Sequence, residues 1–197
     1  MKRYILTGTP GAGKTTILRE LAEQGLEVVE EAATAVIARE QARGVPEPWT
    51  RAAFIDDIVD LQRRRQVRSS ARGSGSVQIY DRSPVCTHAL SLYLGRPVTD
   101  ALAAEIERIT RERVYERRVF FVRNTGSCEP TAARRISFEE SLVFERIHEE
   151  SYRRFGYELV EVPAAPVAVR AALIADAIAG IAAPAPAPAD TAPAPEP

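Results

Sequence analysis

The sequence is poor in cysteine and has no long apolar segment. Cys86 and Cys128 are its only cysteines in 197 residues, too few for a disulfide framework, and neither lies in a CxxC or Cys/His cluster typical of zinc sites. No apolar run approaches the length of a membrane-spanning helix, and the N-terminal residues lack the pattern of a secretory signal. These absences predict a cytoplasmic protein with reduced thiols and no membrane partner.

An excess of charge of either sign is missing as well. The 26 lysine and arginine residues balance 27 aspartate and glutamate residues, and the formal net charge is -1. Such a balance gives no electrostatic reason to expect a polyanionic partner, so nucleic acid is not expected as a ligand.

Length and composition predict one globular domain followed by a tail. The hydrophobic fraction of 45% is typical of a soluble globular protein, and the length suits one α/β domain, which we place at residues 1–181. From Ala183 onward the chain is almost only alanine and proline, which cannot bury enough apolar surface to offset the entropy of ordering. We therefore expect residues 183–197 to form a disordered tail.

Short apolar runs that suit strands alternate with segments of helical periodicity. Helix signals separate them, such as Gly25 after the first helix and the capping box of Ser137 and Glu140 before a later one. This order predicts a parallel sheet with helices on both faces, and such sheets bind ligands outside the carboxyl ends of their strands. The five predicted strands are residues 2–7, 26–29, 77–80, 119–122 and 158–162.

The segment from Gly8 to Thr15 follows the first strand and matches the P-loop pattern G-x-x-x-x-G-K-[ST]. Its glycines let successive backbone N–H groups curl around an anion, and the helix that follows presents the positive end of its dipole. Lys14 can reach the β- and γ-phosphates, and the Thr15 hydroxyl can bind Mg²⁺. We predict a site for Mg²⁺ and ATP, with GTP as the alternative nucleotide, formed by Gly8, Thr9, Pro10, Gly11, Ala12, Gly13, Lys14, Thr15 and Thr16.

Charged residues end the second and third predicted strands, where the sheet should present its ligands. Asp81 can organise the metal ion or its bound water, and Arg82 can neutralise charge on an acceptor or on the transferring phosphoryl group. Glu31 can accept the proton of an acceptor hydroxyl, and the pattern does not decide whether Glu30 or Glu31 faces the site. The structural alternatives are a strand-end ion pair for Asp81 and a carboxylate at a helix N-terminus for Glu31.

A polar segment over residues 124–137, rich in arginine and turn-forming residues, follows the fourth predicted strand. We predict that it is a lid whose Arg134 or Arg135 closes onto the transferring phosphate, and a solvated surface role is the alternative for each. Arg123, just before this segment, is a weaker candidate for the same function.

For several other polar and aromatic residues, a structural role is favoured over a functional one. His88 and His148 lie on predicted helices without partners in the sequence, and Trp49 suits loop packing better than a cover over the acceptor. A run of basic residues on the third predicted helix is typical of a solvated face: Arg63, Arg64, Arg65, Arg68 and Arg72.

The chain resembles the AAA_28-type P-loop ATPase/kinase-like family, which includes the ribosylnicotinamide kinase domain of NadR-like proteins. The resemblance covers nearly all of residues 1–181 and rests on the P-loop, on Val28 to Ala33, on Asp81 to Pro84 and on Phe144 to Pro163. It implies the fold of the nucleoside and nucleotide kinases: a three-layer α/β P-loop NTPase with a five-stranded parallel sheet of order 2-3-1-4-5 and helices on both faces.

The resemblance also implies roles for individual residues. Lys14 and Thr15 would bind phosphate and magnesium. Glu31, Asp81 and Arg82 would form the acceptor and metal region, and Arg135 would belong to the lid. Pro163 would flank the nucleotide base. One departure concerns Thr34, where an arginine is expected in many relatives. This departure from the family pattern favours an acceptor that differs from theirs.

Together these features predict an ATP-dependent kinase that acts on a small-molecule acceptor such as a nucleoside, a nucleotide or a hydroxylated metabolite. The alternative is a nucleotide-switched ATPase or GTPase that regulates or binds a partner and has no small-molecule acceptor. The residues from Asn124 onward do not match the N-K-x-D guanine signature, which disfavours a GTP-specific switch. The sequence does not determine the oligomeric state.

Overall fold

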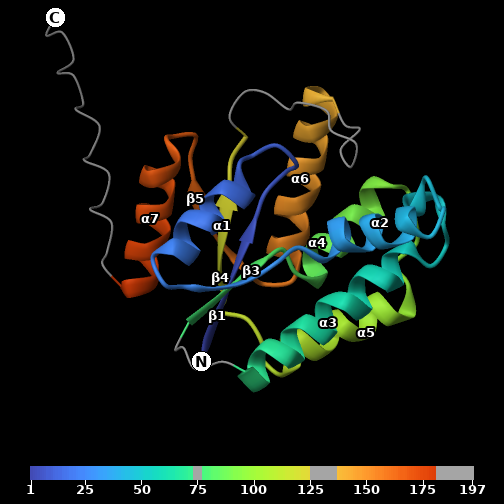
Figure 1. Ribbon diagram of the computed structural model, residues 1–197, viewed down its shortest axis with the longest axis horizontal. Helices are drawn as coiled ribbons and strands as arrows, with labels where there is room; N and C mark the ends of the chain where they lie inside the picture. The colour runs from blue at the N-terminus through green and yellow to red at the C-terminus, as the bar shows by residue number, and fades with distance from the viewer. Residues whose placement is uncertain (73–76, 125–136, 181–197) are drawn as a thin grey trace, which may run out of the picture.

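A five-stranded parallel sheet forms the centre of the computed structural model, which describes residues 1–72, 77–124 and 137–180 (Figure 1). The strands are β1 (Lys2–Thr7), β2 (Glu27–Val29), β3 (Val77–Asp81), β4 (Arg118–Val122) and β5 (Glu158–Val162). Their order in the sheet is β2-β3-β1-β4-β5, which confirms the order that the family resemblance implied. Leu6 pairs with Asp81 and Thr7 with Phe121, so the carboxyl ends of the three central strands lie at one level.

Helices cover both faces of this sheet, as the alternation of elements predicts (Figure 1). They are α1 (Lys14–Glu23), α2 (Ala32–Ala42), the 3-10 helix η1 (Pro48–Thr50), α3 (Phe54–Arg72), α4 (Pro84–Tyr93), α5 (Asp100–Arg111), α6 (Phe138–Arg154) and α7 (Val167–Ala179). On one face, α1 and α7 pack against Leu6 and Phe120. On the other face, α4, α5 and α6 pack against Ile5 and Val119, because successive side chains of a strand point to opposite sides.

A further apolar cluster, in addition to those on the two faces of the sheet, joins α2, α3 and α5 beside the sheet, on the right of Figure 1. Its fully buried members include the larger aliphatic residues Val36, Ile55, Ile58 and Leu102. Fully burying an aliphatic side chain of this size contributes about 1.5–3 kcal/mol, so this cluster is a substantial source of stability for α2 and α3. It fixes these helices as a wall opposite the P-loop.

Side-chain caps begin three of the helices. The Ser83 hydroxyl accepts a backbone N–H of α4 at 3.3 Å, and the Thr99 hydroxyl accepts one of α5 at 3.2 Å. The predicted capping box is present, because the Glu140 N–H donates to the Ser137 hydroxyl while the Ser137 N–H donates to the Glu140 carboxylate. These ends of α4, α5 and α6 are therefore set by local sequence.

Some predictions fall outside the described residues. Most of the predicted lid, over 125–136, and the whole of the predicted tail, over 183–197, are among them. The helix η1 was not predicted, because a segment of three residues is too short to show helical periodicity. Within the described part of the chain, no helix has the length and apolar character needed to cross a membrane.

The first glycine of the P-loop lies against the end of β4. Gly8 has a φ of 134°, and a Cβ atom placed on it would lie 2.3 Å from the carbonyl oxygen of Val122. The positive φ and the nearby main chain of β4 both exclude a side chain here. The Val122 carbonyl oxygen belongs to the backbone, so it cannot rotate away as a side-chain atom could. The turn from β1 into the P-loop therefore requires glycine at this position.

The Gly8→Ala substitution should lower the free energy of unfolding by about 2–4 kcal/mol, because the loop must move away from β4. Denaturant-induced unfolding followed by circular dichroism measures this loss. Gly25→Ala is the matched control, since Gly25 also has a positive φ of 89° but has no atom within 4 Å of an added Cβ. That variant should lose only about 1 kcal/mol, and equal losses would contradict the steric explanation.

Candidate functional site

One cavity of about 630 Å³ opens between the P-loop and the α2–α3 wall. The carboxyl ends of β2 and β3 contribute to it, which agrees with the place predicted for ligands. Its polar end is lined by Pro10, Gly11, Gly13, Lys14, Thr15, Thr16, Glu31, Thr34, Asp81 and Arg82. Its other end is mostly apolar and is lined by Ala33, Ile37, Trp49, Phe54, Ile58, Gln62, Cys86, Thr87, Leu90, Tyr93, Leu94 and Phe144.

Lys14 is buried at the start of α1 and is held by its own loop. Its ammonium group donates to the carbonyl oxygens of Gly8 and Thr9, at 2.9 and 2.8 Å. Burial, with the nearby Arg82 charge as the second cause, lowers the pKa of Lys14 to about 8. The loop thus holds a lysine whose charge is poorly solvated, and an anion beside it would stabilise that charge.

Glu31 and Arg82 form an ion pair in the wall of the cavity. The Arg82 Nε and a Glu31 carboxylate oxygen are 2.6 Å apart, although the N–H bond is not aligned with that oxygen. The second Glu31 oxygen accepts a hydrogen bond from the Thr34 hydroxyl at 2.7 Å. Burial opposes ionisation of Glu31, but Arg82 and then Lys14 outweigh it, so the pKa of Glu31 lies below its ordinary value.

The structure therefore distinguishes the two adjacent glutamates. Glu31 faces the cavity, and Glu30 is exposed to solvent. Successive side chains at the end of an extended segment point to opposite sides, which is why only one of the pair can face inward.

His148 holds the Arg82 guanidinium from the side of α6. The His148 Nδ1 lies 2.9 Å from the Phe144 carbonyl oxygen, which can only accept, so Nδ1 donates and carries the proton. Its Nε2 then accepts from Arg82 Nη1 at 3.2 Å. Burial and then the Arg82 charge lower the pKa of His148 to about 3, which keeps the ring neutral. Arg82 itself has a positive φ of 71°, a backbone conformation that is uncommon for a residue other than glycine.

Asp81 differs from Glu31 in its environment. Burial raises the pKa of the Asp81 carboxyl, and the lowering effect of Lys14 does not offset it. One of its oxygens, Oδ1, is buried and has no hydrogen-bond partner in the described residues. An unpaired buried acceptor is costly, so this oxygen is suited to a cation or to a water bound to one.

Two arginines stabilise the backbone of segments that line the cavity, and neither was identified as a site residue from the sequence. Arg65 of α3 donates to the carbonyl oxygens of Glu30 and Glu31, at 2.7 and 2.6 Å, and so fixes the end of β2. Arg96 donates to the carbonyl oxygens of Trp49 and Arg51, at 2.5 and 2.7 Å, and so fixes the loop that lines the apolar end. Both arginines bond to main chain, and residue type alone does not predict such a partner.

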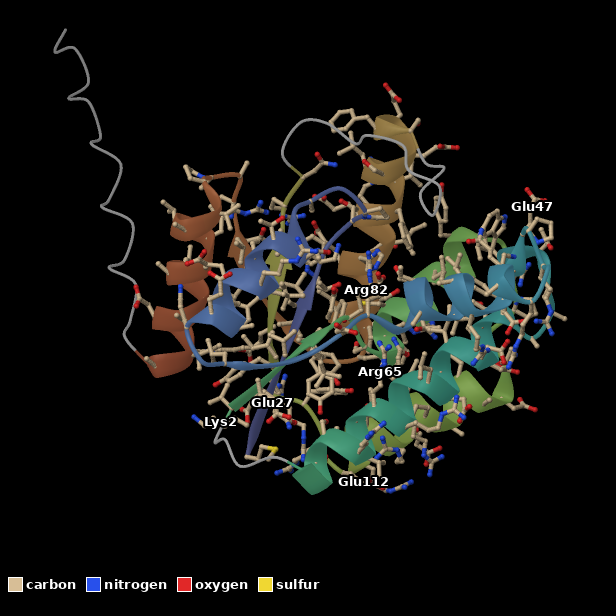
Figure 2. All side chains as sticks on the ribbon, viewed as in Figure 1. Lys2, Glu27, Glu47, Arg65, Arg82 and Glu112 are labelled. Carbon is tan, nitrogen blue, oxygen red and sulfur yellow. The ribbon has the colours of Figure 1, made fainter. Side chains whose placement is uncertain are left out.

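Arg65 and Arg82 lie towards the middle of the molecule in Figure 2, whereas Glu47 and Glu112 lie at its edge. The solvated face predicted for the basic run thus fits Arg63 and Arg64, which are exposed, but not Arg65.

Other predicted candidates lie outside the cavity. Arg123 forms ion pairs with Glu145, Glu149 and Glu161, which gives it a structural role. Pro163 is exposed and does not line the cavity. Arg134 and Arg135, the predicted lid arginines, lie outside the described residues, as does Cys128.

The predicted structural roles of His88 and Trp49 fit their surroundings. His88 is buried, shares a hydrogen bond with the Ser151 hydroxyl at 3.1 Å and packs edge-on against Phe155. Trp49 is half-buried and packs against the α2–α3–α5 cluster, and it also lines the cavity. Within the described residues, no cluster of three His, Cys, Asp or Glu side chains could hold a metal ion.

Three solved structures of deoxyadenosine kinase from M. mycoides share this fold. The structure with the products dCMP and a flexible dCDP has a TM-score of 0.59 and 16% identity, and the match covers 91% of this chain and 100% of that chain. The structure with dATP has a TM-score of 0.57, 17% identity and coverage of 90% and 99%. The structure with dCTP has a TM-score of 0.55, 18% identity and coverage of 92% and 100%.

At these identities the likeness shows a common fold and not a common substrate. No curated protein sequence matches the chain. The family model AAA_28, described as an AAA domain, matches residues 3–170, which confirms the resemblance seen in the sequence. The chain therefore belongs to the AAA_28 family of P-loop proteins.

Proposed function

We propose that this protein is a kinase that transfers the terminal phosphoryl group of ATP to a hydroxyl group of an uncharged small molecule, with Mg²⁺ as cofactor. The observation that carries the proposal is that one cavity contains the P-loop lysine, the Glu31–Arg82 pair and an apolar end. A phosphoryl donor and an acceptor hydroxyl must meet in one water-poor site, and this cavity has room for both.

The donor phosphates would lie on the P-loop. Lys14 would then leave the carbonyl oxygens of Gly8 and Thr9 and pair with phosphate oxygens, which recover its hydrogen bonds and stabilise its charge. The backbone N–H groups from Gly11 to Thr15 and the N-terminal dipole of α1 would contribute further positive potential. The predicted contact of Pro163 with the nucleotide base remains part of this proposal.

Magnesium fits the residues that are present. Thr15 lines the cavity and carries a hydroxyl, and Asp81 has the buried oxygen without a partner among the described residues. Both supply the oxygen ligands that Mg²⁺ prefers, and a divalent cation would favour the ionised form of the Asp81 carboxyl. When bound, the ion would neutralise charge on the phosphates.

The apolar end of the cavity suits an acceptor without a phosphate group of its own. The charged residues among the described lining are Lys14, Glu31, Asp81 and Arg82. Lys14 belongs to the donor loop, and the Arg82 charge is balanced by Glu31. The described residues thus leave no unbalanced cation for an acceptor phosphate, while Trp49 and its apolar neighbours offer surface to a ring or a hydrocarbon part.

Glu31 and Arg82 would prepare the acceptor hydroxyl. Because Arg82 keeps Glu31 ionised, the carboxylate can accept the hydroxyl hydrogen bond and direct an oxygen lone pair towards the terminal phosphate. Phosphoryl transfer needs little proton abstraction before the bond forms, so a carboxylate of low pKa is sufficient. Arg82 would stabilise negative charge that develops on the transferring group, and His148 would keep its guanidinium in place.

The first test of this proposal is dependence on an acceptor. ADP release should rise above basal hydrolysis with at least one compound from a library of nucleosides, nucleotides and hydroxylated metabolites, and mass spectrometry should find that compound phosphorylated. Lys14→Ala should remove the activity and serves as the blank.

The opposite outcome would support the nucleotide-switched alternative. In that case no compound raises ADP release above the basal rate, and exchanging ADP for ATP changes the affinity for a protein partner. A phosphorylated compound as the preferred acceptor would contradict the argument from the balance of charge around Arg82.

The two carboxylates should differ in their effects on catalysis. Asp81→Asn should lower kcat by more than about tenfold and raise the Mg²⁺ concentration needed for half-maximal rate, because it removes a charged oxygen ligand. Glu31→Gln should lower kcat by about 100-fold without changing the Mg²⁺ requirement. Glu30→Gln is the matched control and should have the rate of the unsubstituted protein, since Glu30 is exposed. Equal rates for Glu30→Gln and Glu31→Gln would remove Glu31 from the site.

The lowered pKa of Lys14 predicts a dependence of ATP affinity on pH. Below pH 8 the lysine is already charged and the affinity should be constant, whereas above pH 8 the free protein must take up a proton to bind an anion. Measured without metal by isothermal titration calorimetry from pH 7.5 to 10, the affinity should fall by up to about tenfold per pH unit. Phosphate groups are fully ionised over this range and do not contribute. Lys14→Arg should lose the dependence, because a guanidinium stays charged.

A further inference from the structure

Arg170 is a buried cation that touches the back of the P-loop. It lies in the first turn of α7, and its side chain is almost fully covered. Its Nη2 donates to the carbonyl oxygen of Ala12 in the P-loop at 2.8 Å and to that of Arg123, just after β4, at 3.2 Å. Among the described residues, Arg170 therefore joins α7 to the phosphate loop and to the end of a central strand through main-chain acceptors.

No carboxylate balances this charge within the described part of the chain. Two other largely covered arginines have acidic partners there: Arg82 pairs with Glu31, and Arg108 pairs with Glu105 at 2.7 Å. Arg170 forms no ion pair with a described residue, and its Nε has no hydrogen-bond partner among them. Burial lowers the pKa of Arg170, with no acidic group acting against it, yet the guanidinium stays charged at neutral pH.

The uncompensated charge lies at the N-terminus of α1. A Cβ atom placed on Gly13, the N-cap of α1, would lie 3.1 Å from Arg170 Nη1, so the guanidinium packs directly against that glycine. The backbone of the P-loop is therefore the layer between Arg170 and the cavity. Burying an isolated cation costs free energy, and an anion on the other side of a thin, poorly solvated layer recovers part of it.

We propose that Arg170 is a positioning residue for the phosphate chain of the nucleotide: it fixes the Ala12 carbonyl, and its charge is balanced only when a polyphosphate occupies the P-loop. This inference rests on nucleotide binding by the P-loop, which is part of the proposed function, and does not depend on phosphoryl transfer. Arg170 touches neither the reacting atoms nor the cavity, and it acts through the loop.

Two substitutions separate its charge from its hydrogen bonds. Arg170→Gln keeps a donor and removes the charge, whereas Arg170→Lys keeps the charge and has a less suitable donor geometry. Inorganic tripolyphosphate is the probe, because it carries the charge of the phosphate chain without a base or sugar. In calorimetric titrations at physiological salt, Arg170→Gln should bind it about tenfold more weakly than the unsubstituted protein, and Arg170→Lys should lose less than about threefold.

The loss of affinity caused by Arg170→Gln should increase with the charge of the ligand. The ratio of affinities between the unsubstituted protein and Arg170→Gln should be larger for tripolyphosphate than for pyrophosphate. Arg19→Gln is the control, because it makes the same change of net charge at an exposed position of α1. Its affinity should not change, since solvent and salt screen an exposed charge.

Melting temperatures provide a readout that a structural role would not give. Arg170→Gln should melt at or above the temperature of the unsubstituted protein without ligand, since it removes an unbalanced charge, and it should gain less on addition of tripolyphosphate. Three results would each overturn the inference. They are equal losses of affinity in Arg170→Gln and Arg170→Lys, an unchanged affinity in Arg170→Gln, and an Arg170→Gln protein that is unfolded without ligand. Failure of the unsubstituted protein to bind tripolyphosphate would overturn it together with the nucleotide site, whereas binding without acceptor phosphorylation would contradict only the kinase proposal.

Discussion

The contact between Glu31 and Arg82 is the interaction on which the arrangement of the site depends. Glu31 lies between β2 and α2 and Arg82 follows β3, so their pairing joins the segments that leave two neighbouring strands, and His148 extends the connection to α6. A buried pair of this kind gains little over an apolar contact, but loss of either partner leaves a charge that the fold cannot solvate. Its value is in orientation: a neutral histidine on one side and a carboxylate on the other allow the guanidinium few positions.

The same pair separates the properties of two neighbouring carboxyl groups. Arg82 favours the ionised form of Glu31, while Asp81, beside Arg82 in the chain but buried with an unpaired oxygen, is disfavoured as an anion until a cation arrives. Under the proposed function, one carboxylate would accept the hydrogen bond of a hydroxyl and the other would bind a metal ion. Two groups of one chemical type acquire different tasks from the solvation and charge around them.

Local signals in the sequence predicted most of the fold, because strands, caps and the P-loop depend on neighbours in the chain. Ser137 and Glu140 begin a helix by bonding each other, and Gly8 is required by a turn that the motif encodes. The sheet order came from family resemblance instead, since no local pattern specifies which strands pair. Roles that depend on distant partners could not be read in this way: His148 acts through Arg82, and Arg170 meets Ala12 across 158 positions.

The loop that carries Trp49 is held by its main chain. Arg96 bonds the carbonyl oxygens of Trp49 and Arg51, and the Arg51 side chain pairs in turn with the buried Glu40 of α2. None of these main-chain bonds uses the side chain at position 49, which packs against the α2–α3–α5 cluster. The proposed kinase function assigns the reacting groups to the P-loop end of the cavity and the acceptor to its apolar end. Residues at the apolar end could then change to suit another acceptor without altering the Glu31–Arg82 pair or the main-chain bonds that hold this loop.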